Sequence, residues 1–332
     1  MVNKVKVLGA PFLDLMHGYP LPQMDEEFSS GLKLTLTPGG PASNLAAGIQ
    51  RLGIDTAIIG KVGADWFGSY LEKAFQKEGI GVSGLQMTTG ESTGIVFPVI
   101  DRKGIQRSFE LLNDPLQFEL SEIEVERSFT SESKFLFADG ILLMGDGSSK
   151  ALIKGVKMAQ ENGVSVIFDP NFRLPATAVK NEAKDALEEV LDLTDFLLLN
   201  GEELELLQEV LSPEREREDL VKDLLESETK GVVVKRGERG HEVFTEEGAY
   251  KSEAFSIESV DTQGAGDAFD AGFIAGLTRG LSPRRAAVTG SAAGAIVCSE
   301  ETTWTPLPDL ETLKFFLEEK GEEELADGLS GD

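Results

Sequence analysis

The residues best suited to chemistry lie in the stretch DTQGAGDAFDAGF, residues 261–273. Gly264, Ala265 and Gly266 come directly before Asp267 and an apolar pattern that is typical of a helix. The first N–H groups of a helix have no intrahelical partner and carry partial positive charge, and glycine lets a ligand approach them closely. The sequence therefore predicts an anion site formed by the backbone at the start of this helix.

A carboxylate beside an anion site points to a reaction. Asp267 would weaken the binding of a phosphate group, unless it accepts the proton of a hydroxyl that attacks that phosphate. Phosphoryl transfer depends mainly on positioning and electrostatic stabilisation, which such a site supplies. The alternative is that Asp267 only stabilises the start of the helix. The stretch lacks the Lys-Ser/Thr pair of a Walker A loop and the G-x-G-x-x-G pattern of dinucleotide-binding folds.

Apolar runs of strand length alternate with helical patterns along the chain. The runs lie at residues 5–9, 57–60, 135–140, 164–171, 196–200 and 231–237. Helical patterns lie at residues 43–53, 67–79, 150–163 and 217–227. Strands that are buried on both faces and separated by helices are typical of a parallel sheet. We therefore expect an α/β fold, a doubly wound and mostly parallel sheet flanked by helices, as one domain over residues 1–320.

Two segments depart from this alternation. Residues 12–38 and 92–112 carry the period-two pattern of half-exposed strands, and DRKG at residues 101–104 has the composition of a hairpin turn. We expect these segments to form a small β-sheet that acts as a lid, with an ordinary surface hairpin as the alternative. Residues 321–332 are acidic and interrupted by glycine, which predicts a disordered tail.

The composition excludes several classes of partner. The net charge of −27 over 332 residues repels nucleic-acid phosphates and anionic lipids, so we expect neither as a partner. The single cysteine, Cys298, allows no internal disulfide, and no apolar run approaches the roughly 18 residues of a membrane helix. We therefore expect a cytoplasmic protein. The two histidines, His17 and His241, do not favour a zinc site or a Ser-His-Asp triad.

Five motifs resemble those of the ribokinase-like (PfkB) carbohydrate kinases, in the same order. They are PGGPASNLAAGIQRLG (38–53) with GKVGADWFG (60–68), DPNFR (169–173), NGEE (200–203), VVVKRGERG (232–240) and DTQGAGD (261–267). The last of them matches the signature D-T-x-G-A-G-D, and the resemblance covers about residues 3–310. It implies a ribokinase-like fold and an ATP-dependent sugar kinase that uses Mg²⁺.

The resemblance also implies roles for the residues around the reacting phosphate. Asp267 matches the base that deprotonates the acceptor hydroxyl, and the backbone of residues 264–266 matches the anion hole for the transferred phosphate. Asn200 and Glu203 match the N-x-x-E residues that organise Mg²⁺ and its waters around the nucleotide, in keeping with the oxygen ligands that Mg²⁺ prefers. A solvated helix face is the alternative for Glu203.

Residues near the N-terminus match the sugar-binding positions of the family. These are Asp14, Gly39, Gly40 and Asn44, and a carboxylate such as that of Asp14 can accept hydrogen bonds from two vicinal hydroxyls. A turn residue is the alternative for Asp14, and a helix N-cap is the alternative for Asn44. Arg173 of the DPNFR motif could reach the sugar or the phosphates.

The nucleotide loop and a cation site are also implied. Lys235, Gly237 and Gly240 match the loop that runs along the nucleotide, although the charge of Lys235 could instead be solvated at the surface. Asp261 matches a residue that binds a monovalent cation in some members. The second loop of that site, CSEETTW at residues 298–304, lacks the expected glycine. A K⁺ site is therefore left open.

The sequence leaves two classes of phosphate acceptor open. We expect transfer of the γ-phosphate to a primary hydroxyl of a small fructose- or ribose-like sugar. A nucleoside kinase is the alternative, with an apolar pocket from Phe12, Phe97 and Phe109. FEL at residues 109–111 stands where members acting on 2-keto-3-deoxygluconate carry Tyr-x-Arg, which argues against that substrate. A non-catalytic sugar- or nucleotide-binding protein is a further alternative, but such a protein would not need Asp267 as a base. Lids of this kind can pair between subunits, so we expect a homodimer.

Overall fold

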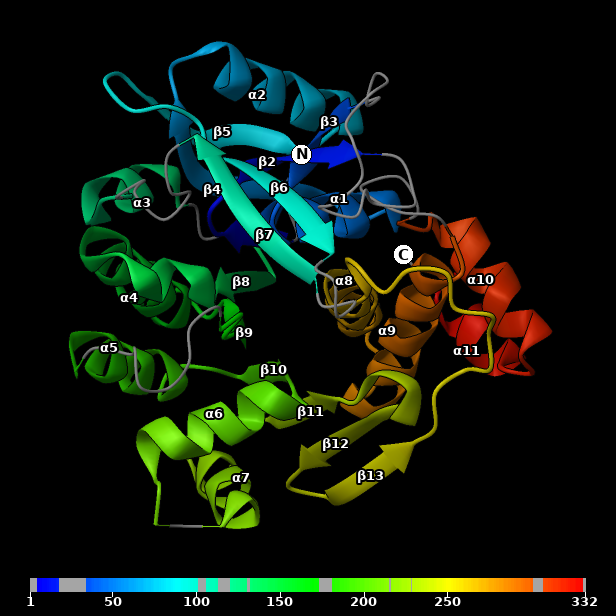
Figure 1. Ribbon diagram of the computed structural model, residues 1–332. Helices are drawn as coiled ribbons and strands as arrows, with labels where there is room; N and C mark the ends of the chain where they lie inside the picture. Colours follow the sequence, from blue (N-terminus) through cyan, green and yellow to red (C-terminus); the bar gives the residue numbers. More distant parts are fainter. Residues whose placement is uncertain are drawn as a thin grey trace.

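A computed structural model describes residues 5–17, 34–100, 106–112, 120–129, 132–172, 181–214, 216–227, 229–300 and 307–330. These residues form a large sheet and a small one, with helices around the large sheet (Figure 1). The large sheet has nine strands, in the order β13 (Gly248–Ser252), β12 (His241–Thr245), β11 (Gly231–Lys235), β10 (Phe196–Asn200), β9 (Ser165–Asp169), β8 (Phe135–Asp139), β1 (Val5–Leu8), β4 (Thr56–Gly63) and β5 (Gly81–Thr88).

The large sheet is parallel from β5 to β11, and only β12 and β13 at the other edge run antiparallel. All residues of β1 and β8, and the first four of β10 and of β11, are buried. Such strands are covered on both faces, which is why their sequences read as continuous apolar runs. The predicted α/β fold with a mostly parallel sheet is confirmed.

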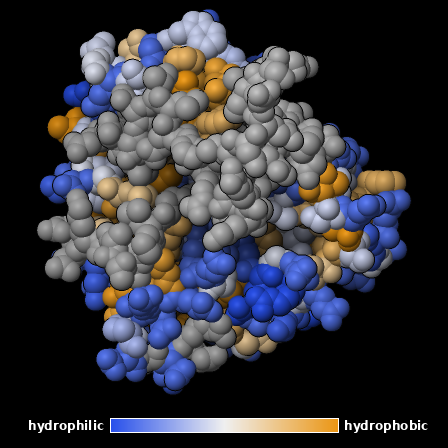
Figure 2. Space-filling model, viewed as in Figure 1, coloured by the Kyte–Doolittle hydropathy of each residue, from blue (hydrophilic) through white to orange (hydrophobic). Residues whose placement is uncertain are grey.

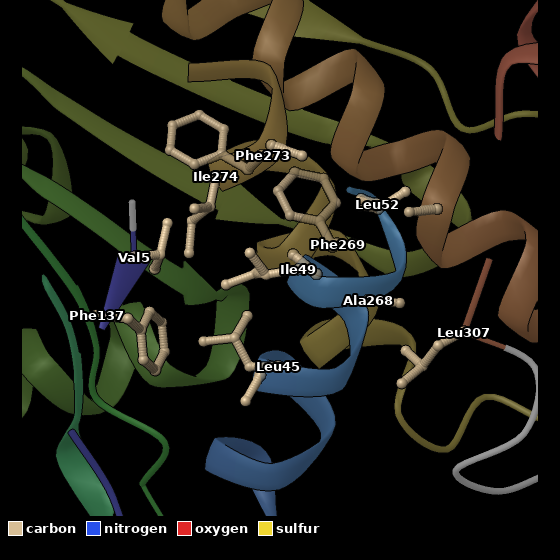
Figure 3. Close-up of a cluster of buried hydrophobic side chains, with 14 of the residues drawn as sticks. Val5, Leu45, Ile49, Leu52, Phe137, Ala268, Phe269, Phe273, Ile274 and Leu307 are labelled. Atoms are coloured by element: carbon tan, nitrogen blue, oxygen red, sulfur yellow. The ribbon is translucent and has the colours of Figure 1, made fainter. Parts of the chain in front are cut away.

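Alternate strand residues enter two separate cores, one on each face of the sheet. One core contains the helices α1 (Pro41–Arg51), α2 (Trp66–Glu78), α8 (Ala265–Thr278), α9 (Pro283–Cys298) and α10 (Leu310–Glu319). The other contains α3 (Glu122–Ser128), α4 (Asp146–Glu161), α5 (Asn181–Leu191), α6 (Gly201–Leu211), α7 (Arg217–Glu226) and the 3₁₀ turn η2 (Gly140–Met144). Figure 3 shows part of the first core, where Ile49 of α1 lies in one cluster with Val5 of β1 and Phe269 of α8.

The small sheet has the order β3 (Leu34–Gly39), β2 (Phe12–His17), β6 (Ile95–Ile100) and β7 (Gln106–Leu112). Strands β2 and β6 run parallel, while β2–β3 and β6–β7 are antiparallel pairs. All four strands come from the two segments in which the sequence predicts a lid. The predicted turn at residues 101–104 lies outside the described residues.

The prediction of a disordered tail is wrong for most of its length. Residues Glu323–Gly328 form a short helix, α11, in which Leu325 and Ala326 are buried in the same core as α10. Leu329 follows at helical spacing and is 1% exposed. The apolar side of this segment therefore outweighs its acidic character, which the exposed residues supply.

Part of the visible surface is strongly hydrophilic. Figure 2 shows hydrophilic side chains over the lower part of this face, where Figure 1 places α6, α7, β12 and β13. None of the helices described here combines the length and apolar character needed to cross a membrane.

Candidate active site

The predicted anion turn lies at the start of α8. Gly264 is the N-cap with φ 74°, and Asp267 lies in the first turn of the helix. A Cβ atom at Gly264 would meet nothing within 4 Å, so the space beside this turn is open. Gly266 is exposed, whereas the Ala265 N–H donates to the Thr262 carbonyl at 3.3 Å. The turn thus has the predicted position, although one of its N–H groups already has a partner within the turn.

Asn44 contacts Asp267 directly. The Asn44 Nδ2 atom donates to Asp267 Oδ2 at 2.8 Å, across 223 residues of sequence. The N-cap of α1 is Gly40, so the alternative reading of Asn44 as an N-cap is wrong. Helices α1 and α8 approach closely, because a Cβ at Gly48 would lie 2.7 Å from Ala271 Cβ. This packing brings the first turns of two helices together, and so places the Asn44 amide against the Asp267 carboxylate.

Asp14 and the two glycines form the lid side of the site. A Cβ at Gly39 would lie 2.3 Å from Asp14 Oδ2, so the carboxylate covers this glycine. A Cβ at Gly40 would lie 2.5 Å from the Phe12 ring. Asp14 is half-buried within β2, which rules out the alternative of a turn residue. The carboxylate stands where the chain passes from the lid into α1.

Asn200 and Glu203 form a capping box at the start of α6. The Asn200 N–H donates to Glu203 Oε2 at 2.7 Å, and the Glu203 N–H donates to Asn200 Oδ1 at 2.9 Å. Glu203 is 9% exposed, so the alternative of a solvated helix face is wrong. The pair supplies oxygen donors at the carboxyl end of β10, which is the chemistry that a Mg²⁺ ion with bound waters requires.

Lys235 occupies neither of its expected environments, an open phosphate contact or a solvated surface. Its Nζ atom lies 2.7 Å from Asp169 Oδ2 and 3.0 Å from Asp270 Oδ1, and both carboxylates are buried. A Cβ at Gly266 would lie 4.0 Å from the same Nζ atom. The ammonium group is therefore part of an ion cluster directly beside the anion turn, with two carboxylates already bound to it.

The contacts within the ion cluster shift the pKa values of Lys235 and Asp270. Burial alone would lower the pKa of Lys235, but the carboxylates of Asp169, Asp270 and Glu203 raise it. Burial raises the pKa of Asp270 well above its ordinary value, and its hydrogen bond with Asp169 adds to the increase, while Lys235 opposes it. The protonation of Lys235 and of Asp270 is therefore set by their contacts with each other in a buried site.

The nucleotide loop contains two glycines in different surroundings. Gly240 has φ 82°, and a Cβ there would lie 1.9 Å from the Ser252 carbonyl oxygen. Gly237 has φ 55°, and a Cβ there would meet nothing within 4 Å. The 3₁₀ turn η4 (Gly237–Arg239) joins them. The Arg236 side chain binds Glu242, with Nε–Oε2 at 2.7 Å. The loop is therefore open to a ligand at Gly237 and closed at Gly240.

Asp261 and Arg173 are the last two predicted site residues. Asp261 Oδ1 accepts a hydrogen bond from the Gln263 N–H at 2.9 Å, and its own N–H faces the Cys298 carbonyl at the end of α9, at 3.4 Å. It thus lies beside the segment that would complete a K⁺ site. Arg173 lies outside the described residues.

The sequence reasoning missed the roles of Asp169 and Asp270. Asp169 was part of a recognised motif, but without an assigned function. Asp270 had a detectable signal, because it is the one charged residue in an otherwise apolar helical stretch after Asp267. A charge at such a position requires a buried partner.

Comparisons with known proteins agree with this geometry. The 5-dehydro-2-deoxygluconokinase of Clostridium perfringens is 29% identical over 287 residues, which cover 86% of this chain and 85% of that protein. Probable fructokinase-6, chloroplastic, of Arabidopsis thaliana is 29% identical over 284 residues, which cover 83% of this chain and 73% of that protein. An E. coli protein described as ribokinase II, in complex with ATP and Mg²⁺, has a TM-score of 0.83 at 26% identity, with 96% of this chain and 99% of that chain covered.

The family comparison covers most of the sequence. The family model described as "pfkB family carbohydrate kinase" matches residues 19–310, which include both signature regions. With its ribokinase-like fold, its lid sheet and its carboxylate at the mouth of a helix, this chain belongs to the pfkB family of carbohydrate kinases, phosphotransferases that act on an alcohol group.

Proposed function

We propose that Asp267 is the general base of an ATP-dependent sugar kinase, and that the acceptor is a small fructose- or ribose-like sugar with a primary hydroxyl. The observation that carries this proposal is the 2.8 Å contact between Asn44 Nδ2 and Asp267 Oδ2. It holds a half-buried carboxylate beside the anion turn at Gly264–Gly266. A carboxylate in this place is useful to a reaction and unfavourable for phosphate binding alone.

The reaction follows from this arrangement. The acceptor oxygen attacks the γ-phosphorus while Asp267 accepts the hydroxyl proton, and the bond from that phosphorus to the β,γ-bridging oxygen breaks. ADP leaves with the bonding electron pair. The N–H groups of the anion turn stabilise the negative charge on the transferred phosphate.

The nucleotide and its metal would lie on the main sheet. Asn200 and Glu203 would hold Mg²⁺ through water, and the ion would supply positive charge to the phosphates. Gly237 would contact the nucleotide on the open side of its loop. The related E. coli protein in complex with ATP and Mg²⁺ supports both ligands. A K⁺ ion at Asp261 is a further part of this proposal.

The acceptor would bind between the lid and the main sheet. Asp14 would accept hydrogen bonds from sugar hydroxyls beside Gly39, and closure over the acceptor would exclude water as a competing nucleophile. The named relatives act on sugars or sugar acids, which supports a small carbohydrate. We also propose a cytoplasmic homodimer that pairs through the lid, since the edge strands of a small sheet can pair with a second copy.

The test is phosphoryl transfer from Mg-ATP to fructose, ribose, glucose, 2-keto-3-deoxygluconate, 5-dehydro-2-deoxygluconate, inositol, adenosine, cytidine and uridine. General-base catalysis contributes about 10²–10⁴-fold, so Asp267→Asn should lower kcat by about that factor. Asp146→Asn is the matched control, because Asp146 also lies in the first turn of a helix but at an exposed position on α4.

Each outcome has a distinct meaning. Acceptor-dependent ADP release that is lost in Asp267→Asn and retained in Asp146→Asn supports the base and identifies the acceptor. Equal turnover by Asp267→Asn and the wild type contradicts the mechanism. Turnover of a nucleoside alone favours the nucleoside kinase alternative. Binding of ATP by calorimetry without turnover of any acceptor favours a non-catalytic protein.

A further inference from the structure

Asp65 joins helix α2 to the beginning of the lid strand β6. Its Oδ1 atom accepts hydrogen bonds from the Gly68 N–H at 2.8 Å and the Thr93 hydroxyl at 2.8 Å. Its Oδ2 atom accepts from the Thr93 N–H, also at 2.8 Å. One carboxylate therefore caps a helix of the main body and holds the residue two positions before β6.

The same junction is attached to the main sheet. Thr93 is fully buried, and its Oγ1 atom accepts a hydrogen bond from the Gly63 N–H at the end of β4, at 3.1 Å. A Cβ at Gly63 would lie 2.6 Å from the Thr93 nitrogen, and a Cβ at Gly68 would lie 2.0 Å from the Gly63 carbonyl oxygen. These contacts leave no room for side chains at either glycine, so the junction is tightly packed.

A short path leads from this junction to the candidate acceptor site. The Gly94 carbonyl, next to Thr93, accepts a hydrogen bond from the Leu13 N–H at 3.0 Å. Strands β2 and β6 then pair in register, with Leu13 opposite Ile95 and Asp14 opposite Val96. The backbone of Asp14 is thus one residue away from a hydrogen bond to the segment that Asp65 holds.

Helix α2 holds the lid at a second point as well. The Tyr70 hydroxyl donates to the Leu36 carbonyl of β3 at 2.9 Å, and Trp66 stacks on the Tyr70 ring at 5.6 Å between centroids. The lid is therefore fixed to one helix through β3 and through the start of β6. The described contacts include no other hydrogen bond between α2 and a strand of the lid.

We propose that Asp65 and Thr93 form the fixed pivot of the lid and act as positioning residues for Asp14. The proposal rests on the proposed function, since it assigns Asp14 to the acceptor. It assigns to Asp65 an effect on the acceptor side and none on ATP, because the Asp65–Thr93 junction contacts β4, α2 and β6 but no residue of the anion turn or the nucleotide loop in the described contacts.

The test uses Asp65→Asn in the full-length protein. Asparagine caps a helix as well as aspartate does, so α2 should keep its cap. Its NH₂ group would face the Thr93 N–H, donor against donor, so one of the two hydrogen bonds from Thr93 is lost. Asp309→Asn is the matched control, because Asp309 caps α10 through the Thr312 N–H at 2.8 Å and lies away from the lid.

Two readouts decide the proposal. Amide hydrogen exchange in peptides covering residues 12–15 and 94–97 should become about tenfold faster in Asp65→Asn, the factor expected for one lost hydrogen bond. It should stay unchanged there in Asp309→Asn. With fructose as the probe acceptor, KM for fructose should rise about tenfold, while KM for ATP stays within twofold. Thr93→Val removes only the hydrogen bonds of the hydroxyl. It should change the exchange rate and the KM for fructose in the same direction as Asp65→Asn.

Contrary results are equally clear. Unchanged exchange in both peptides, or the same increase in Asp309→Asn, overturns the pivot. Equal increases in the two KM values overturn the positioning of Asp14. If the wild type does not phosphorylate fructose, exchange still decides the pivot. The general base is tested separately by Asp267→Asn, so failure of one proposal is distinguishable from failure of the other.

Discussion

The phosphate side and the acceptor side of the candidate site are held by different kinds of interaction. The anion turn lies beside the ion cluster of Asp169, Lys235 and Asp270, in which the two carboxylates are each 2% exposed. Asp14, on the acceptor side, is half-buried and is held through backbone hydrogen bonds that end at Asp65. Charge fixes one side, while strand pairing and a helix cap fix the other.

This difference suits the two tasks. The N–H groups that stabilise a transferring phosphate must stay in place, because electrostatic stabilisation depends on donors that need no reorganisation. A lid must admit and release an acceptor, which requires contacts that break at low cost. Substitutions on the phosphate side should therefore lower the stability of the whole protein. Those on the acceptor side should mainly change acceptor KM.

The largest effect is expected for Lys235→Met, which tests the phosphate side of the comparison. It leaves Asp169 and Asp270 buried beside each other without a cation. Removal of one partner from a buried ion pair costs about 3–5 kcal/mol, and urea unfolding should show a loss of that size. Lys157→Met is the control, since it removes the exposed pair with Glu189 and should cost about 1 kcal/mol or less.

A loss below about 1 kcal/mol in Lys235→Met would contradict this account of the ion cluster. It would mean that the two buried carboxyl groups tolerate the loss of the cation at little cost. In that case the double variant Lys235→Met/Asp270→Asn should be no more stable than Lys235→Met. If the account is correct, Asp270→Asn should instead restore part of the loss.

The same comparison shows why sequence reasoning succeeded unevenly. The parallel sheet was predictable, because strands buried on both faces are continuously apolar, and the helix at Gly264 was predictable from small residues followed by apolar periodicity. The pairing of Lys235 with Asp270 was not, since 35 residues separate them and only the fold brings them together. The helix α11 was missed because acidic residues masked the spacing of Leu325 and Leu329.

A smaller effect is expected in the nucleotide loop, where the two glycines can be compared directly. Gly240→Ala places a Cβ against the Ser252 carbonyl oxygen in a left-handed backbone conformation, which should cost about 3 kcal/mol. Gly237→Ala has only the conformational strain, about 1 kcal/mol. Thermal unfolding of both variants checks the difference, and KM for ATP should rise in Gly237→Ala because the methyl group occupies the open side.

Equal destabilisation by the two alanines would show that the loop relaxes around Gly240. The phosphate side would then be less rigid than its burial indicates. An unchanged KM for ATP in Gly237→Ala would remove this glycine from the nucleotide site.

The smallest effect concerns pH, and it arises from His241 at the start of β12. Its ring packs edge-on against Phe269 at 5.7 Å, and the residue is 2% exposed. Neither ring nitrogen has a hydrogen-bond partner among the described residues. Burial lowers the pKa of His241 to about 4. The unfolded chain, with an ordinary histidine pKa near 6.5, therefore binds a proton that the folded protein does not.

The phosphate side should consequently lose stability in mild acid. The contribution of His241 is fully present above about pH 6.5 and falls as the pH drops toward 4, by about 1 kcal/mol at pH 5.5. Burial would raise the pKa of Asp65 on the acceptor side, but hydrogen bonds from Gly68 and Thr93 lower it, so its contribution is lost only in stronger acid. Urea unfolding at pH 7.0 and 5.5 should show a smaller decrease for His241→Phe than for the wild type. His241→Gln, which cannot titrate, should behave like His241→Phe, and equal decreases in all three proteins would show that the ring finds a proton acceptor in the folded state.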